Sequence, residues 1–392
     1  MKGYRTIVGT GLLVVFALAT VFFVYAPRIA ADRFNPVLSR GPYAVPDSVR
    51  QFHESLLIVD LHADQTLWDR DVTKRSDVGH VDLPRLREGN VAIQVFSAVT
   101  KSPVGQNHER NEGDTDRITR LVVGQLWPVR TWNSLLERAL YQAKKLQIAE
   151  TKDALFRILR SKHDLDTFLR DRKQNRKLTA GILAIEGMHT LEAEISNFAR
   201  LADAGFRMMA ATHFFDNEVS GSAHGLSGEG LSPLGRQMIK RQIAQGIMID
   251  VAHISPAAID DILEMSDEPL VFSHGGVQAT CPTPRNLSDR HIKAIAESGG
   301  VIGVGYWDTA LCGEGVDAII RAMSHIRELT GSTENIALGS DFDGTVTTPF
   351  DTAGIIMLTE GLLSAGYTET EIRQIMGENA LRVFLQVLPL SD

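Results

Sequence analysis

Eight short β-rich runs, most of them separated by helical patterns, constrain the fold of this chain more than any other feature. The runs lie at 56–61, 91–99, 181–185, 208–212, 247–252, 270–273, 301–306 and 336–339. The clearest helical patterns lie at 132–148, 191–204, 256–265 and 316–329, with Ser255 as the expected N-cap of the third. Strands that alternate with helices favour a parallel sheet, and a closed barrel needs eight such units. We therefore predict an α/β fold, a (β/α)8 TIM-like barrel.

The limits of this domain follow from composition. The chain has 392 residues, of which 44% are hydrophobic and 22% charged, so it has ample material for a buried core. Three prolines within 28–49 and few periodic apolar positions indicate a linker there. We expect the barrel domain at 50–388, with terminal helices within 369–387.

The amino terminus carries a run without charged residues, from Ile7 to Pro27, preceded by Lys2 and Arg5. A membrane-spanning helix takes roughly 20 residues, whereas the apolar part of a cleaved signal has about 7–15. We favour an uncleaved anchor, with 1–27 forming a short cytoplasmic tail and a transmembrane helix. The positive residues then place the domain outside the cytoplasm, in the periplasm or the extracellular space. A long signal cleaved near Ala30 is the alternative, and it also exports the domain.

The net charge and the cysteine content limit the kinds of partner and metal site that we expect. The formal net charge is −8, and no dense Lys/Arg run lies outside 157–177, so nucleic acid is not expected. Small molecules or peptides are the better candidates. The two cysteines, Cys281 and Cys312, are too few for Cys-rich metal chelation. In an oxidising compartment they form a disulfide; otherwise they are two buried thiols.

Polar residues stand at the ends of most β-rich runs or just after them. They are Asp60 near the end of the first run with His62 and Asp64 just after it, then Glu186, His213, His253 and His274, and finally Asp341 and Asp343 after the eighth run. The carboxyl ends of barrel strands converge on one face, where catalytic groups collect. Residues far apart in the sequence are therefore expected to share one pocket.

Five of these residues form a candidate metal site. His62 and Asp64 are two apart on an extended segment, so their side chains point the same way. Such a pair alone is weak evidence, but Glu186, His253 and His274 at other strand ends strengthen it. Imidazole and carboxylate without thiolate suit Zn²⁺, with Mn²⁺ or Co²⁺ as substitutes. The two oxygens of Glu186 can bridge two ions about 3.5–4 Å apart.

Three further residues have candidate roles beside the metals. Asp341 can take a proton from the attacking water and pass it to the leaving amine, although a buried loop-capping Asp is the alternative. His213 can stabilise an oxyanion. Arg285 can bind a terminal carboxylate with its planar fork, whereas most loop arginines are solvated.

Other polar residues near the strand ends are weaker candidates for a role in the site. His189 and His224 are candidates for a supporting role around the metals, and Asp250 either orients a ligand or is a satisfied core carboxylate. The glycine-rich stretch 225–230 lacks the lysine that a phosphate-binding loop requires.

These segments together resemble the membrane dipeptidase (renal dipeptidase) family of zinc metallopeptidases, from about residue 50 to Phe384. The motifs that carry the resemblance are VDLHAD at 59–64, IEGMH at 185–189, ATH at 211–213, IDVAHIS at 249–255, FSH at 272–274, RN at 285–286, GSDFDG at 339–344 and GENALRVF at 377–384.

The resemblance assigns roles residue by residue. It implies a barrel of the metal-dependent hydrolase type in which His62 and Asp64 hold one zinc ion, His253 and His274 hold the other, and Glu186 bridges them. It further implies substrate-binding roles for His213, Arg285 and Asp341, with Asp341 as the acid/base and His213 assisting catalysis. It favours a Cys281–Cys312 disulfide and suggests a homodimer.

The activity implied is hydrolysis of dipeptides, including those with a carboxyl-terminal D-residue, by a metal-bridged hydroxide. One alternative is a related barrel amidohydrolase acting on cyclic amides or lactones. Such enzymes commonly have a His-x-His motif after the first strand, whereas this chain has Asp64 in place of the second histidine. Another is an inactive membrane-anchored metal-binding scaffold, but no expected ligand is missing. Mammalian relatives carry a carboxyl-terminal lipid anchor, whereas this chain ends at 388–392 without a long apolar tail, so anchoring is expected at the amino terminus.

Overall fold

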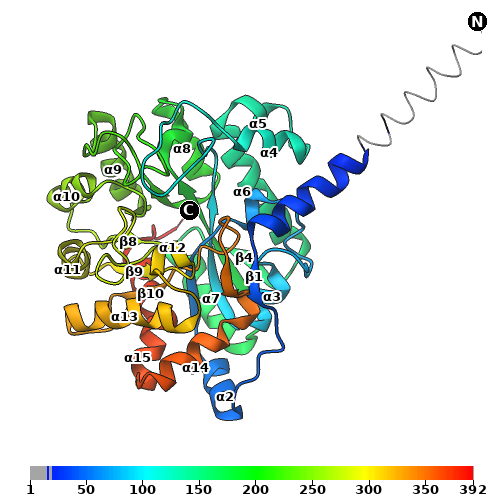
Figure 1. Cartoon of the computed structure of the whole chain (residues 1–392), viewed down its shortest axis with the longest axis vertical. Helices are drawn as coiled ribbons and strands as arrows, with labels where there is room; N and C mark the ends of the chain where they lie inside the picture. The colour runs from blue at the N-terminus through cyan, green and yellow to red at the C-terminus, as the bar shows by residue number, and fades with distance from the viewer. Residues whose placement is uncertain (1–15, 17–19, 392) are drawn as a thin grey trace, which may run out of the picture.

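Eight parallel strands form a closed barrel at the centre of the domain (Figure 1). The structure is a computed structural model, and it describes residue 16 and residues 20–391. The barrel strands are β2 (Ile58–Ala63), β3 (Val91–Ala98), β5 (Thr179–Glu186), β6 (Phe206–Ala210), β7 (Met248–Asp250), β8 (Val271–Phe272), β9 (Val301–Val304) and β10 (Ile336–Leu338). Pairing of β10 with β2 and of β3 with β5 closes the ring. The predicted barrel is confirmed, and each expected β-rich run overlaps one barrel strand.

A ninth strand, β4 (Phe156–Ile158), pairs with β5 beside the ring and was not predicted. Its middle residue, Arg157, is charged and only partly buried, so the segment does not appear as an apolar run. The barrel strands are easier to see in the sequence because they are covered on both sides. Every residue of β3 and β5 is buried, as expected of parallel strands that carry nearly continuous apolar residues.

Helices surround the barrel and join its strands (Figure 1). The main ones are α6 (Leu135–Lys152), α7 (Lys162–Gln174), α8 (Ser196–Asp203), α9 (Pro233–Gln245), α10 (Pro256–Met265), α11 (Asp289–Glu297), α13 (Val316–Thr330) and α14 (Ile356–Ser364). Ser255 caps α10 as predicted, because its side chain accepts a hydrogen bond from the Ala258 N–H.

The chain ends in α15 (Glu369–Arg373), a π-helical turn at Gln374–Glu378, and α16 (Asn379–Val387), within the expected helical region. Ala380, Val383 and Phe384 of α16 pack in the same buried apolar cluster as Val59 and Leu61 of β2. The terminal helices therefore stabilise the barrel, and the functional side chains lie at the carboxyl ends of its strands.

The long connection from β3 to β5 holds α4 (Ile118–Gly124), α5 (Arg130–Asn133), α6, β4 and α7. The first part of this connection is polar and packs toward the carboxyl ends of the strands. The Asn111 N–H donates to the His224 carbonyl, and Lys101 Nζ donates to the Gly113 carbonyl at 2.5 Å. This loop therefore borders the pocket described below.

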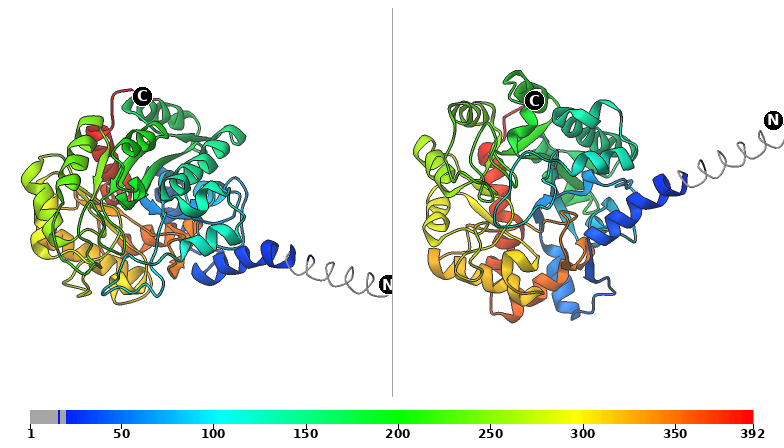
Figure 2. Two further views of the ribbon diagram at one scale, coloured as in Figure 1. Left: turned by 90° about the horizontal axis from the view of Figure 1, so that it is seen from above. Right: turned by 45° about the horizontal axis from the view of Figure 1, so that its top comes forward.

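At the amino terminus, a helix at 20–34 extends from one side of the barrel, as both views of Figure 2 show. It is followed by β1 (Val37–Ser39), which pairs in parallel with β11 (Thr348–Phe350), and by α2 (Asp47–Ser55). The expected linker, 28–49, thus contains the end of a helix, a strand and the first residues of α2. Its extended part becomes a strand because β11, far away in the sequence, offers a partner.

The predicted transmembrane helix, 7–27, falls largely outside the residues that the structure describes. Among the described residues, no helix is both long enough and apolar enough to cross a membrane.

Cys281 and Cys312 form a disulfide bond, as the family resemblance implied. The bond joins the segment after β8 to the end of α12 (Asp308–Leu311), and it closes over a chain separation of 31 residues.

Candidate metal centre

The residues predicted to share a pocket lie together at the carboxyl ends of the barrel strands. A cavity of about 550 Å³ opens there, and its lining includes Asp64, Glu186, His213, His253, His274, Arg285 and Asp341. His62 lies beneath it, with its Nε2 3.6 Å from a Glu186 carboxylate oxygen. The sequence reasoning therefore placed all eight side chains in one site.

Glu186 is the centre of the cluster. Its Oε1 lies 3.0 Å from His253 Nε2, 3.3 Å from His274 Nε2 and 3.6 Å from His62 Nε2. Its Oε2 lies 3.5 Å from His213 Nε2. A single carboxylate thus faces imidazoles that come from four different strand ends.

A second group of donors surrounds His62. Its Nε2 lies 3.4 Å from Asp64 Oδ1 and 3.9 Å from Asp341 Oδ1. His62 Nε2, Asp64 Oδ1 and Glu186 Oε2 are buried and have no hydrogen-bond partner among the described residues. Buried polar atoms are rarely left without a partner, so these atoms are arranged for a ligand.

The spacing of these atoms fits shared metal ions. Ligand atoms about 2.0–2.2 Å from a tetrahedral Zn²⁺ are separated from one another by roughly 3.3 Å. Three groups of side chains bring their ligand atoms within 4.8 Å of one another: His62 with Glu186 and His274, Glu186 with His213 and His253, and His62 with Asp64 and Asp341. Two neighbouring ions with Glu186 between them can be accommodated by these donors.

The electrostatics of the cluster favour cations. Burial, together with the neighbouring Asp64 carboxylate, raises the pKa of Glu186 well above its usual range. Although burial lowers the pKa of His62, the carboxylates of Glu186 and Asp64 raise it to about 10. Burial keeps the pKa values of His253 and His274 well below the usual range, so both imidazoles are neutral and have a lone pair for a metal.

A hydrogen-bond chain fixes the orientation of His274. Ser273 Oγ donates to Asp250 Oδ2 at 2.6 Å and lies 2.9 Å from His274 Nδ1. With Asp250 as the acceptor of the hydroxyl proton, His274 Nδ1–H donates to Ser273 and Nε2 is free to face the cluster. Asp250 therefore orients His274 and not His253, although His253 is nearer in the sequence. The Ser273 hydroxyl that joins Asp250 to His274 was not predicted from the sequence.

Two site residues lie in left-handed backbone conformations. The φ angles of His253 and Asp341 are 62° and 58°. Residues other than glycine rarely adopt such angles, and they concentrate at functional sites where the surroundings enforce them. The backbone turns sharply at both strand ends, and each side chain lines the cavity as a result.

Arg285 is buried at another part of the cavity. Its Nη2 donates to the His274 carbonyl at 2.5 Å, and its guanidinium lies 5.2 Å from the centre of the Phe272 ring. Burial lowers the pKa of Arg285 to about 10, so it remains a cation at neutral pH. Its Nη1 is buried without a hydrogen-bond partner among the described residues. This nitrogen is available to an anionic group in the cavity.

His189 and His224 lie beside the site and contact residues around it. His189 Nε2 lies 3.0 Å from Thr100 Oγ1. The His224 ring stacks on Phe214 at 4.4 Å, and its Nδ1 lies 2.8 Å from the His108 carbonyl. Neither histidine joins the groups of candidate metal ligands found among the described residues.

The glycine-rich stretch 225–230 is organised by Asp216. The Asp216 carboxylate accepts hydrogen bonds from the backbone N–H groups of Ser222, Leu226 and Ser227. Because a carboxylate already uses these donors, the stretch is not arranged to bind phosphate, in agreement with the sequence analysis.

A (β/α)8 barrel with clustered imidazoles and carboxylates at the carboxyl ends of its strands defines a metal-dependent hydrolase. The model of the membrane dipeptidase family, peptidase family M19, matches residues 47–391, and the chain belongs to this family. It is accordingly a metallo-dipeptidase.

Two relatives are similar to this chain in sequence. The chain is 32% identical over 233 residues to an uncharacterized protein in the pqqA 5′ region of Klebsiella pneumoniae, covering 55% of this chain and 85% of the relative. It is 27% identical over 319 residues to an uncharacterized dipeptidase of Schizosaccharomyces pombe, covering 78% and 73%.

A solved structure shares the fold. It is a metallopeptidase from Rhodobacter sphaeroides, bound to a phosphinate mimic of the dipeptide L-Ala-D-Ala. Its TM-score is 0.70 at 23% identity, with 85% of this chain and 99% of that chain covered.

Proposed function

We propose that this metallo-dipeptidase uses two zinc ions, one held by His62 and Asp64 and the other by His253 and His274, with Glu186 between them. The observation that carries the proposal is the position of Glu186 within 3.6 Å of His62, His253 and His274. Two bound zinc ions would supply Lewis-acid chemistry, lowering the pKa of the attacking water and polarising the scissile carbonyl.

The other site residues act on the substrate. Arg285 holds the carboxylate of the dipeptide through Nη1, which has no other described partner. His213 lies beside Glu186 and stabilises the oxygen of the scissile carbonyl as charge develops there. Asp341 takes a proton from the attacking water and gives it to the leaving amine.

This arrangement explains a restriction to dipeptides. Because Arg285 requires a free carboxylate one residue beyond the scissile bond, a longer peptide places an uncharged amide at that position. The Rhodobacter protein binds a mimic of L-Ala-D-Ala. That ligand supports the extension of our proposal to dipeptides with a carboxyl-terminal D-residue.

A panel of substrates tests the proposal. Release of free amino acids is measured from L,L- and L,D-dipeptides, from the matched tripeptides and from dipeptide amides. We expect hydrolysis of free dipeptides alone, abolished by a chelator and restored by zinc. Hydrolysis of cyclic amides or lactones instead would favour the related amidohydrolase activity, and a zinc-loaded protein inert toward every substrate would favour a scaffold.

We further propose that the uncharged run that begins at Ile7 anchors the enzyme in a membrane, with the barrel outside the cytoplasm and the part of the run from residue 20 on packed against the barrel. The uncharged run after Lys2 and Arg5 and the disulfide of Cys281 and Cys312 support this placement. A reporter fused after Asp392 should be active only outside the cytoplasm, and the protein should stay in the membrane fraction after carbonate extraction. By family resemblance we propose a homodimer, to be checked by sedimentation in detergent.

A further inference from the structure

The cavity above the candidate metal centre extends well beyond the site residues. Its volume of about 550 Å³ lies within the range of roughly 300–1,000 Å³ that suits drug-sized ligands, which are larger than two small amino acids. Its outer part is walled by apolar side chains from the helix at 20–34, from the segment after Asp64 and from α4. We call this part the antechamber, and its main side chains are Phe22, Ala26, Phe34, Leu67, Trp68 and Leu121.

The antechamber wall includes a segment outside the family match. The family model begins at residue 47, whereas the helix that supplies Phe22, Ala26 and Phe34 lies at 20–34. The shared family region therefore does not account for this wall, and its effect on substrates is a property of this chain.

The helix at 20–34 is held against the domain. Ala31 is buried in an apolar cluster with Leu67, Trp68 and Ile118. Arg28 forms an ion pair with Asp77 at 2.5 Å. Directly after the helix, Asn35 Oδ1 accepts a hydrogen bond from the Thr345 N–H, and β1 pairs with β11.

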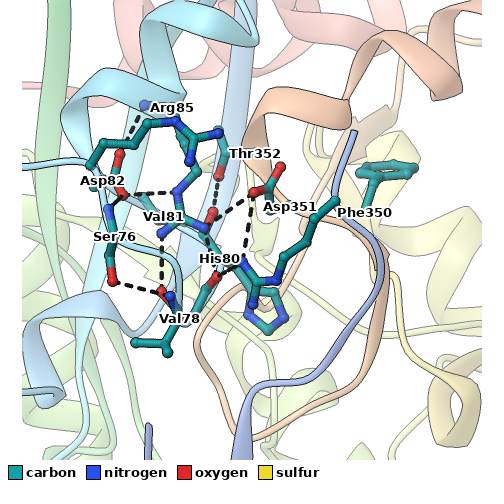
Figure 3. A network of polar contacts seen from close by, with 12 residues as sticks. Ser76, Val78, His80, Val81, Asp82, Arg85, Phe350, Asp351 and Thr352 are labelled. Atoms are coloured by element: carbon teal, nitrogen blue, oxygen red, sulfur yellow. Dashed lines mark hydrogen bonds and ion pairs between the residues drawn. The ribbon is translucent and has the colours of Figure 1, made fainter. Parts of the chain in front are cut away.

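A buried charge network secures the strand pair beneath this helix (Figure 3). Asp351, directly after β11, accepts a hydrogen bond from Arg85 Nη1 at 3.2 Å, and Arg85 Nε donates to Asp82 at 2.8 Å. Arg40, directly after β1, donates to the Gly79 carbonyl and lies 4.0 Å from Asp351. These contacts bind both strands to the barrel, so the helix has a fixed place beside the cavity.

The antechamber lies next to the Asp64 part of the site. Asp64 leads directly into the 3-10 turn Gln65–Leu67, and Leu67 and Trp68 line the antechamber. Arg285 belongs to the segment after β8 and contacts Phe272 and His274. A dipeptide with its carboxylate on Arg285 and its carbonyl beside Glu186 therefore directs its amino-terminal residue toward Asp64 and the antechamber.

We propose that the antechamber selects dipeptides whose amino-terminal residue has a large apolar side chain. This inference rests on the proposed dipeptidase function and names its substrate class. Burial of such a side chain against Leu67, Trp68 and Leu121 removes apolar surface from water, whereas an alanine side chain leaves the space unfilled. The polar side chains at this end include Arg117 and Arg120, so an acidic amino-terminal residue is the competing choice.

The test compares Ala-Ala, Phe-Ala and Glu-Ala as substrates of the full-length protein in lipid nanodiscs. We expect kcat/KM for Phe-Ala to exceed that for Ala-Ala by about tenfold, as burial of a phenyl ring allows. Replacement of Ala26 by Leu and then by Trp fills the antechamber in two steps. Each step should reduce the preference for Phe-Ala over Ala-Ala, and Ala26→Trp should abolish it.

The matched control is Ile29→Trp, which adds bulk to the same helix at a position that is 63% exposed and does not line the cavity. It should keep the wild-type preference. Equal rates on Phe-Ala and Ala-Ala, a preference for Glu-Ala, or a preference unchanged in Ala26→Trp would each overturn the inference while leaving the dipeptidase function intact. Failure to hydrolyse any dipeptide would overturn both.

Discussion

The carboxylate of Asp250 is linked to the imidazole of His274 through a single hydroxyl group, that of Ser273, at 2.6 and 2.9 Å. His274 Nδ1 is thereby held as the donor, and Nε2 faces Glu186 at 3.3 Å. This chain of contacts determines which nitrogen is available to a metal.

Loss of this link should weaken metal binding. We expect Ser273→Ala and Asp250→Asn each to reduce zinc affinity by about 10–100-fold, because outer partners of ligating histidines contribute on this scale. Competition with a chromophoric chelator measures the affinity without reference to activity. Ser55→Ala, on the far end of α2, is the control and should bind zinc as the wild type does. Unchanged affinity in both site variants would show that His274 needs no orienting partner.

Arg285 should be essential for recognition of the carboxylate. Replacement by Lys keeps the charge but loses the planar fork, and we expect kcat/KM for free dipeptides to fall by about 100-fold, or about 3 kcal/mol. Dipeptide amides, already poor substrates, should be affected far less. A parallel loss on free and amidated dipeptides would mean that Arg285 does not bind the carboxylate.

Asp341 should act in proton transfer and not in metal retention. Asp341→Asn is expected to lower kcat by about 10²–10⁴-fold, the usual contribution of a positioned acid/base, while the protein keeps its full zinc content. Elemental analysis beside the kinetics separates the two roles. Loss of one zinc ion per chain would instead show that Asp341 is a metal ligand. Asp341 Oδ1 lies 3.9 Å from His62 Nε2, which is close enough for the two to share an ion.

His53 gives a prediction about stability that is independent of the metal centre. It is buried between Thr359 Oγ1 at 2.8 Å and the Gly89 carbonyl at 3.1 Å, and burial lowers its pKa from 6.5 to about 4. His53 therefore binds a proton more readily in the unfolded chain than in the folded protein. The contribution of neutral His53 to stability is complete above about pH 6.5 and is lost as the pH falls toward 4.

Urea unfolding of metal-free wild type and His53→Gln at several pH values measures this effect. Between about pH 7 and pH 4, the free energy of unfolding of the wild type should fall by up to about 3 kcal/mol more than that of the variant. Parallel pH dependence in the two proteins would contradict the assignment.

Local sequence patterns were enough to predict the barrel and the candidate site. The barrel strands are buried on both sides, so they appear as apolar runs, and parallel topology brings residues such as His62 and His274 to the same face. The cap at Ser255 was likewise predictable, because a cap and its partner at Ala258 are neighbours in sequence.

Features that depend on distant partners could not be predicted in this way. The strand at 37–39 exists because of Thr348–Phe350, more than three hundred residues later, and the link from Asp250 to His274 depends on the register of β7 against β8. The helix at 20–34 becomes part of the cavity wall only because β1 and its neighbours hold it there. No local pattern records such long-range contacts.

The central claim is a site for two zinc ions with Glu186 between them, and its most direct test is zinc titration of the chelated, full-length protein with dipeptide hydrolysis followed at each addition. We predict that activity returns to its maximum at two zinc ions per chain and that Glu186→Gln fails to reach this stoichiometry. Full activity at one zinc ion per chain, or a Glu186→Gln variant that still binds two, would contradict the account.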